Sequence, residues 1–338
     1  MVYELQFHVK DWSVSQAIAT AKSQLQNYSF TTYEMGVRAE ENEKKSLLAQ
    51  VRKEFSKEFS QKQVLQFPDI GILMDFISQK VILRIFPLII TGHYQKLQRG
   101  IAQTRHFCYQ CKGVGRFQGK VCDICNGEKI LTKESVQELI TPFFLHAFEA
   151  KEMLFHGAGR EDVDVLMLGN GRPFALSIEN PKKRDVDVHA LEEKINAQLK
   201  FKVHLLHLRI GQPSDVETIT QSYHAKRYRA VAECSSAADF ELLAKHLGKK
   251  TDVIQFTPTR MEKRRALKER MHWIVLENYK KINKTQVEIT LHASQGCYIK
   301  EFISGDEGKS VPSLSEWLGE KCMCKELDVI EIVENFNN

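Results

Sequence analysis

Hydrophobic residues recur with two different periods along this chain of 338 residues, which predicts a fold that mixes helices with strands. Residues 2–9 alternate between apolar and polar side chains, as a strand does, whereas residues 13–25 place Val14, Ile18 and Leu25 on one helical face. The same criteria predict further helices over residues 41–59, 135–150 and 189–199, and further strands over residues 31–38, 68–79, 79–94, 174–179, 202–210, 273–277, 285–293 and 327–333.

Length and composition favour two domains with a small insert, because 338 residues of which 43% are hydrophobic can bury more than one core. No apolar run approaches the roughly 18 residues that a membrane span needs. The first residues lack the pattern of a signal peptide, so we expect a cytoplasmic protein with no membrane partner. In that compartment the eight cysteines indicate metal ligands or free thiols rather than disulfides.

The net charge of +5 is modest, but the basic residues gather in a few places. They cluster at residues 182–184, at Lys226 and Arg227, and between Arg260 and Arg270. Such clusters can follow a phosphate backbone, and they can equally be ordinary solvated surfaces. Charge alone leaves both interpretations open.

Two Cys-x-x-Cys pairs, Cys108 with Cys111 and Cys122 with Cys125, lie ten residues apart. Four thiolates at this spacing can close a tetrahedral site around zinc, and they leave no open position for catalysis. The sequence therefore predicts a structural Zn²⁺, with four unliganded thiols as the alternative. A zinc hydrolase or deaminase would need an open metal position and usually a His-x-Glu pair, which this knuckle lacks.

The stretch from His156 to Phe174 holds four glycines and an acidic cluster that directly follows Arg160. A predicted helix with a capping pattern at Ser135 and Glu138 leads the chain towards it. Glycines permit close approach of the backbone to a ligand, and the apolar run after Asp164 predicts a buried strand. A carboxylate fixed where a turn enters a rigid strand suits a reactive group. The alternative is a tight turn with solvated acids.

Two later strings carry similar chemistry. Tyr228 lies among basic residues at the start of a predicted strand, which suits stacking on a base while cations hold phosphates. A tyrosine at a sheet edge with solvated charges would give the same string. The residues from Gly296 to Phe302 read GCYIKEF, which alone favours an ordinary junction between a strand and a helix.

Together these strings resemble one enzyme family. Gly159 to Asp162 resembles the Gly-Arg-x-Asp turn of pseudouridine synthases. The longer string GREDVDVLMLGNGRPF is similar to the archaeal and eukaryotic tRNA pseudouridine synthases that modify positions 54 and 55 of the T-arm. Lys226 to Tyr228 resembles their Lys-x-Tyr motif, and Gly296 to Lys300 resembles their Gly-x-Tyr-Ile-Lys/Arg motif. The family usually carries Arg where this chain has Leu166, and often His where it has Lys263.

The resemblance implies roles for particular residues. Asp162 would be the essential carboxylate, paired with Lys300, and Tyr228 would pack against the target uracil and accept or relay the C5 proton. The other residues that it implicates in substrate binding are Arg160, Tyr298, Leu327, Arg260, Arg264 and Arg265. It implies no organic cofactor and no obligate protein partner, and its substrate would be the T-arm of tRNA.

The resemblance also implies an α+β fold. Residues 1–104 would form a small α/β accessory domain like the RNA-binding THUMP module, and residues 105–130 the zinc knuckle. Residues 131–338 would form the catalytic domain, a mixed and largely antiparallel sheet with flanking helices and a central cleft. The implied activity is isomerisation of a tRNA uridine, at position 55 and also at 54, to pseudouridine. The alternative is a non-catalytic RNA-binding protein stapled by zinc.

Overall fold

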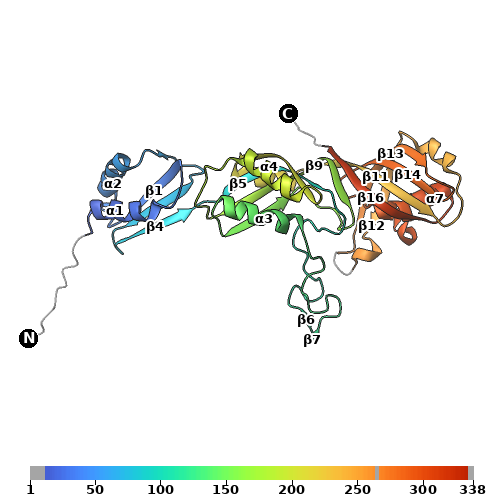
Figure 1. Cartoon of the computed structure of the whole chain (residues 1–338), viewed down its shortest axis with the longest axis horizontal. Coiled ribbons are helices and arrows are strands. Elements are labelled where there is room, and N and C mark those ends of the chain that lie inside the picture. Colours follow the sequence, from blue (N-terminus) through green and yellow to red (C-terminus); the bar gives the residue numbers. More distant parts are fainter. Residues whose placement is uncertain (1–11, 263–265, 334–338) are drawn as a thin grey trace, which may run out of the picture.

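The computed structural model describes residues 12–262 and 266–333, which form three parts. Figure 1 shows a small N-terminal unit at one end, a large sheet extending away from it, and a lobe with β6 (Arg116–Phe117) and β7 (Lys120–Val121) that projects from one side. No helix in the described ranges combines the length and the apolar character that crossing a membrane requires. The mixture of helices and strands confirms the predicted α+β class.

The N-terminal unit packs two helices against a four-stranded sheet. In chain order its elements are α1 (Val14–Leu25), β1 (Thr32–Arg38), α2 (Lys44–Glu58), β2 (Lys62–Gln63), β3 (Ile70–Asp75) and β4 (Lys80–Ile85). The strands lie in the order β2-β1-β3-β4, and β1 runs parallel to both of its neighbours. Both helices were predicted, and Phe55 on the apolar stripe of α2 packs fully buried against Tyr33 of β1. The strand expected over residues 2–9 lies outside the described residues.

A sheet of ten strands, counted over the described residues, forms the body of the protein. Its strands are β5 (Leu88–Lys96), β8 (Glu152–Gly157), β9 (Leu166–Glu179), β10 (Val203–Gly211), β11 (Ala225–Cys234), β12 (Lys250–Phe256), β13 (Glu269–Lys281), β14 (Gln286–Ala293), β15 (Ser310–Val311) and β16 (Cys322–Val333). They lie in the order β10-β5-β9-β16-β11-β14-β13-β12-β15, and β8 pairs with β9 beside this path. Within the described sheet, pairing is antiparallel except between β9 and β16, so the prediction of a mixed, largely antiparallel sheet is confirmed.

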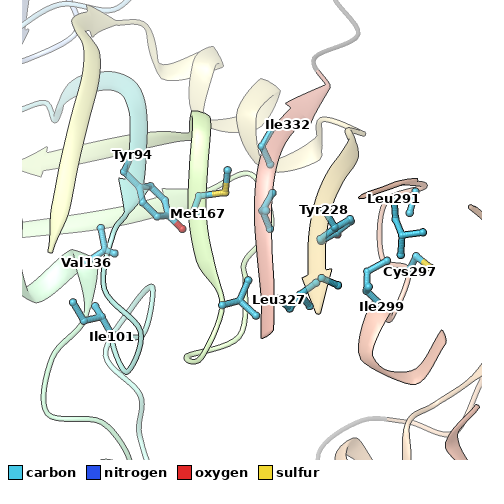
Figure 2. Close-up of a cluster of buried hydrophobic side chains, with 14 of the residues drawn as sticks. Tyr94, Ile101, Val136, Met167, Tyr228, Leu291, Cys297, Ile299, Leu327 and Ile332 are labelled. Carbon is cyan, nitrogen blue, oxygen red and sulfur yellow. The ribbon is translucent and has the colours of Figure 1, made fainter. Parts of the chain in front are cut away.

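Helices flank the sheet. They are α3 (Val136–Ala147), α4 (Val188–Leu199), α5 (Pro213–Gln221), α6 (Ile299–Ser304) and α7 (Leu314–Leu318), with 3₁₀ turns η1 (Phe240–His246), η2 (Thr259–Met261) and η3 (Asp306–Gly308). Figure 1 shows α3 and α4 over the part that contains β5 and β9. Ser135 caps α3 as predicted, since its side chain accepts a hydrogen bond from the Glu138 N–H at 3.1 Å. Figure 2 shows Met167, Leu327 and Tyr228 on β9, β16 and β11, where the apolar core passes from strand to strand.

The parallel pairing of β9 with β16 covers two residue pairs, at Leu166 and Met167. Gly169 then passes so close to β16 that an added Cβ would lie 1.8 Å from the Ile330 carbonyl oxygen. Its φ of +59° also requires glycine. Beyond this crossing the Asn170 side chain exchanges two hydrogen bonds with the backbone of β16, at 2.7 and 3.0 Å. A side chain therefore continues the contact where the backbone ladder stops.

The expected accessory domain of residues 1–104 includes one strand that belongs to the large sheet. Residues 88–96 form β5, which pairs with β9 and β10 of the large sheet. The N-terminal unit therefore ends near Ile85, and the expected boundary was too late by one strand. An apolar alternation predicts a strand but does not identify its sheet, because tertiary contacts decide the partner.

A segment between β9 and α4 holds the N-terminal unit against the large sheet. The Arg184 side chain is 9% exposed and donates to the Asp69 carboxylate at 3.1 Å. The same guanidinium donates to the carbonyl oxygen of Phe86, and the Arg184 backbone N–H donates to the Ser29 hydroxyl at 2.7 Å. The basic cluster at residues 182–184 was a candidate for phosphate contact, but the Arg184 guanidinium binds Asp69 and Phe86 of the protein itself.

Arg184→Ala is expected to loosen the N-terminal unit, because the three hydrogen bonds of the guanidinium are lost, and a single hydrogen bond to a charged group contributes about 1.5–3 kcal/mol. Small-angle scattering should then report a larger radius of gyration, and trypsin should cleave faster after Arg84, the exposed residue of β4 close to the junction. Lys183→Ala is the matched control, since Lys183 is 57% exposed and pairs with Glu149 at the surface. Identical scattering and cleavage for the two variants would contradict the proposed clamp.

Candidate active site

A cleft of about 450 Å³ opens where β9, β16 and β11 meet near the middle of the large sheet. Its walls come from the turn between β8 and β9, from these three strands, from η2 and from the start of α6. The residues predicted from sequence that line it are Arg160, Asp162, Tyr228, Arg260, Tyr298, Lys300 and Leu327. Segments separated by more than a hundred residues are thus brought to one cavity, at the centre of the sheet where the cleft was expected.

The turn that carries Asp162 is anchored by a buried ion pair between Glu161 and Arg172, whose side chains are each 1% exposed. Arg172 Nε donates to a Glu161 carboxylate oxygen at 2.8 Å, and the Tyr94 hydroxyl lies within 3.1 Å of both oxygens. Lys96, also buried, places its ammonium 3.8 Å from the same carboxylate. Burial alone would lower the pKa of Arg172, but the charge and hydrogen bond of Glu161, together with Tyr94 and Tyr228, raise that pKa.

The backbone of this turn is held from the same side. Lys96 Nζ donates to the carbonyl oxygens of Asp162 and Val163 at 2.9 and 3.3 Å. The Gln103 side chain donates to the Gly159 carbonyl oxygen at 2.8 Å. Three buried side chains from β5 and the segment after it, those of Tyr94, Lys96 and Gln103, therefore fix the turn, so the direction of the Asp162 side chain is set by a rigid support.

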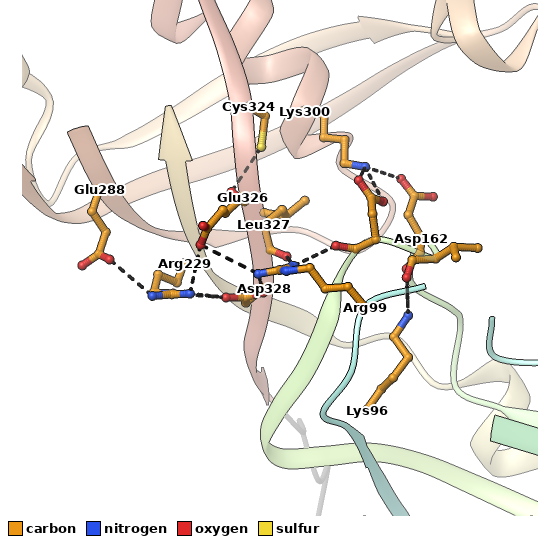
Figure 3. A network of polar contacts seen from close by, with 12 residues as sticks. Lys96, Arg99, Asp162, Arg229, Glu288, Lys300, Cys324, Glu326, Leu327 and Asp328 are labelled. Atoms are coloured by element: carbon orange, nitrogen blue, oxygen red, sulfur yellow. Dashed lines mark hydrogen bonds and ion pairs between the residues drawn. The ribbon is translucent and has the colours of Figure 1, made fainter. Parts of the chain in front are cut away.

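Arg99 ties the other end of the turn to β16. Its guanidinium donates to the carbonyl oxygens of Asp164 and Leu327 at 2.7 and 2.9 Å and pairs with the Asp328 carboxylate at 2.6 Å. Figure 3 shows Arg99 between the turn and β16, with Arg229 approaching Asp328 from the opposite side. Because the Asp328 side chain is 0% exposed, the two arginines supply the charge that its burial requires.

The Asp162 carboxylate faces two cations in the cleft. Its Oδ2 lies 3.3 Å from Lys300 Nζ and 3.1 Å from Arg260 Nη1, so the predicted pair with Lys300 is present. Lys300 is nearer to Asp164, at 2.7 Å from both oxygens. Partial burial opposes the charged form of Asp164, but the hydrogen bond from Lys300 holds its pKa below the ordinary value. The Asp162 side chain is 42% exposed on the wall of the cleft, so a substrate in the cleft can reach it.

Tyr228 lies on β11 with 8% of its surface exposed and lines the cleft beside Leu327. Burial raises the pKa of its phenol, so the hydroxyl keeps its proton at neutral pH. A protonated phenol can relay a proton or pack against a flat ring, but it is not a phenolate base. Tyr298 begins α6, and its backbone exchanges two hydrogen bonds with the Gln255 side chain at 2.8 and 3.0 Å.

Arg260 was expected to contact an RNA backbone, but much of its charge is already paired. Besides Asp162, it meets the buried Glu301 carboxylate at 2.7 Å. Its side chain is 40% exposed, so it still reaches the rim of the cleft. Arg264 and Arg265, the other two expected backbone contacts, lie outside the described residues.

The two arginines that flank the tyrosine of β11 were candidate phosphate ligands, but both form ion pairs within the protein. Arg227 pairs with Glu277 at 2.9 Å and with Glu331 at 2.6 Å. Arg229 pairs with Asp328, as Figure 3 shows. Because side chains alternate along a strand, these arginines lie on the face opposite the cleft, where they join β11 to its neighbours.

Several residues of the site were missed in the sequence. Tyr94 and Lys96 had been assigned to the accessory domain, and no local pattern connected them to the turn. Arg172 lay inside a quoted string without a role, and Lys226 was considered only as a member of a basic cluster and of the Lys-x-Tyr string. Both are buried and line the cleft. An arginine at the start of the apolar run of residues 171–178 was the one available signal, because a buried guanidinium needs a partner.

The four cysteines of the projecting lobe form a buried group that could hold a metal. Their sulfur atoms all lie within 4.8 Å of one another, with Cys108 and Cys122 at 3.8 Å and Cys111 and Cys125 at 3.6 Å. A tetrahedral site with Zn–S bonds of about 2.3 Å has S–S edges of about 3.8 Å. The Gly115 N–H donates to the Cys111 sulfur at 3.3 Å, as expected beside a thiolate. The residues therefore fit a tetrahedral thiolate site.

Comparisons with known proteins agree on one family. The family model described as "Pus10, C-terminal" matches residues 89–333. A protein of Methanocaldococcus jannaschii named tRNA pseudouridine synthase Pus10 is 40% identical over 273 residues, which cover 80% of this chain and 58% of that protein. A protein of the same name from Halorubrum lacusprofundi is 33% identical over 335 residues, which cover 92% of this chain and 78% of that protein. A solved Cbf5-Nop10-Gar1 complex overlaps 58% of this chain and 44% of its own at 14% identity and a TM-score of 0.34, too loosely to bear on the site.

Glu161→Gln is expected to lower the free energy of unfolding by about 3–5 kcal/mol, because it leaves the buried Arg172 without a charged partner. Asp164→Asn is the control. Asp164 is 68% exposed, and removing an exposed ion pair costs less than about 1 kcal/mol. Urea unfolding of both variants measures the difference. Equal losses in the two would show that the buried pair does not anchor the turn.

Proposed function

The chain belongs to the Pus10 family, and on that premise we propose that it is an isomerase that converts a tRNA uridine to pseudouridine. The N1–C1′ bond breaks, the uracil turns within the cleft, and a C5–C1′ bond forms. Product and substrate contain the same atoms, so the reaction needs neither an electron acceptor nor an organic cofactor. Since the chain spans 58% of the length of the M. jannaschii relative, the proposal concerns the chemistry that these residues support.

Asp162 is the observation that carries this proposal. Its carboxylate stands on a turn fixed by buried ion pairs, and it reaches a cleft large enough for a nucleotide. Lys300 and Arg260 lie close enough to keep it oriented, at 3.3 and 3.1 Å. We propose that it attacks the sugar or the ring, or removes the C2′ proton, during isomerisation. Such a rigidly mounted acid has no evident use in binding RNA alone, because a phosphate backbone repels it.

The walls of the cleft suit a flipped uridine. Extruding the base costs a few kcal/mol, which stacking and hydrogen bonds in the cleft must offset. Tyr228 and Leu327 offer an apolar wall for the ring, and Tyr298 shapes the entrance from the start of α6. Arg160 and Arg260 lie at the exposed rim, where the phosphates of the flipped nucleotide would pass.

A second hollow of about 270 Å³ adjoins the first across Asp162. Thr104, Arg105 and His106 line it, and they lead directly into the cysteine lobe. We propose that this hollow receives the next nucleotide of the same strand. The family name supports tRNA as substrate, and we propose the T-arm, at uridine 55 and also at 54.

The other two parts are proposed to hold the remainder of the tRNA. Helix α2 of the N-terminal unit presents a row of exposed cations towards solvent: Lys44, Lys45, Arg52, Lys53 and Lys57. A basic helix of this kind can follow a phosphate backbone. In the lobe, Zn²⁺ held by the four cysteines would close the fold with no open coordination position, and so act as a structural staple.

Asp162→Asn is expected to abolish pseudouridine formation while tRNA binding changes less than about threefold, because the amide keeps the shape but loses the charge. Release of tritium from a T-arm transcript labelled at uracil C5 measures the reaction, and filter binding measures affinity. Glu307→Gln is the control, since Glu307 belongs to η3 and does not line the cleft. Turnover by Asp162→Asn would overturn the assignment. Absence of turnover by the wild type would favour a non-catalytic RNA-binding protein.

Purified protein is expected to contain about one zinc per chain, since four thiolates satisfy one tetrahedral ion. Cys111→Ser should lose the metal and expose the lobe to trypsin at Arg116 and Lys120. Cys234→Ser, which alters a buried thiol of β11, should keep both the metal and the resistance. Plasma emission spectrometry measures the metal. A wild-type protein without zinc that resists trypsin equally well would refute the structural role.

A further inference from the structure

Lys226 is a buried cation at the cleft to which none of the roles above has been assigned. It lies on β11 two residues before Tyr228, on the same face of the strand, and 7% of its surface is exposed. Its Nζ donates one hydrogen bond, to the His224 carbonyl oxygen at 3.0 Å. Over residues 12–262 and 266–333 no carboxylate oxygen lies within ion-pair distance of it. An ammonium has three N–H donors, so Lys226, which lines the cavity, has donors left over for a ligand there.

The surroundings make this position electrostatically costly. Arg172, another buried cation, also lines the cleft, and its carboxylate partner Glu161 is shared with Lys96. Two buried cations thus share one buried carboxylate, and Lys226 is a third buried cation that has no carboxylate partner among the described residues. Burial first, and the charge of Arg172 second, lower the pKa of Lys226 to about 8, so most of the population is still charged at neutral pH. Such an unneutralised charge beside a cavity is typical of a functional site.

We propose that Lys226 donates a hydrogen bond to a carbonyl oxygen of the target uracil and stabilises the negative charge that the ring acquires when the N1–C1′ bond breaks. The inference rests on the proposed isomerase activity and adds a catalytic residue to it. Arg172 of β9 supports this role of Lys226, because it adds a second positive charge to the same end of the cleft.

The movement of electrons in the reaction explains why a cation beside the uracil is useful. When N1–C1′ breaks heterolytically, the bonding electron pair stays on the uracil, whose charge spreads over N1 and the two carbonyl oxygens. C5 then uses an electron pair of the ring to bond C1′, its proton leaves to a base, and N1 gains a proton. Lys226 forms no covalent bond and returns unchanged. A preorganised donor aimed at developing charge typically contributes about 10²- to 10³-fold in rate.

Burial favours the base over a phosphate as the ligand of Lys226. The phosphates of a flipped nucleotide remain continuous with the rest of the strand, so they stay near the exposed rim, whereas the base reaches inward. Lys226 is 7% exposed, whereas the side chain of Arg260, at the rim, is 40% exposed. The more buried cation therefore meets the uracil ring.

Lys226→Met tests the proposal, because methionine keeps the length and removes the charge. The single-turnover rate of tritium release from the T-arm transcript should fall about 10²- to 10³-fold, with its dissociation constant changed less than threefold. The melting temperature should stay the same or rise, since an unpaired buried charge is removed. Lys226→Gln, which keeps a neutral donor, should lose less activity than Lys226→Met.

Lys325→Met is the control, because Lys325 lies exposed on β16 in a surface pair with Glu233 at 3.1 Å. It should behave as wild type. The inference fails if Lys226→Met keeps its rate within about tenfold, or if both Lys226 variants melt at clearly lower temperatures, which would indicate a structural lysine. If wild type and Lys325→Met also release no tritium, the proposed isomerase activity itself is what has failed.

Discussion

A buried carboxylate needs a cationic partner in direct contact. The arrangement of the cleft depends on the partners that neutralise Glu161. Its partners Arg172 and Tyr94 come from β9 and β5, and Lys96 adds a second positive charge. Each of these side chains is itself buried. If one of them moved, a buried charge would lose its partner, so the group holds its arrangement as a unit. The backbone of Asp162, the next residue along the chain, is therefore positioned through its neighbour, while Arg260 and Lys300 lie beside its carboxylate.

The cleft lies at a joint in the sheet. Two residue pairs of backbone ladder connect β9 to β16, and beyond them side chains set the spacing of the two strands. Asn170 continues the contact on one side, while Arg99 binds the turn and the buried Asp328 on the other. Long antiparallel ladders, of β9 with β5 and of β16 with β11, hold the two strands on either side of this junction. The cleft thus opens where only two residue pairs of backbone ladder join the described strands β9 and β16.

Much of this arrangement could be predicted from the sequence, and the limits have physical causes. The resemblance of three short strings to a known family named Asp162, Tyr228 and Lys300 as candidates, and all three line one cleft. The supporting residues Tyr94 and Lys96 could not be identified, since their roles arise from contacts more than sixty residues away. Basic residues were interpreted as solvated or RNA-facing, yet Arg184 and Arg229 are used in ion pairs within the protein. Charge in a sequence does not reveal which partner will neutralise it.

The cysteine lobe leaves and rejoins the body at a single place. Cys108 and Leu131 at its base are joined to the returning and departing chain by backbone hydrogen bonds of 2.9 and 2.8 Å, so the two stems are fastened together. The lobe lies between β5 and α3, so it interrupts no strand of the large sheet. Over evolution such an appendage can grow, shrink or be exchanged for another without shifting the register of the sheet. Related chains can in this way differ in the lobe while they share the sheet and its cleft.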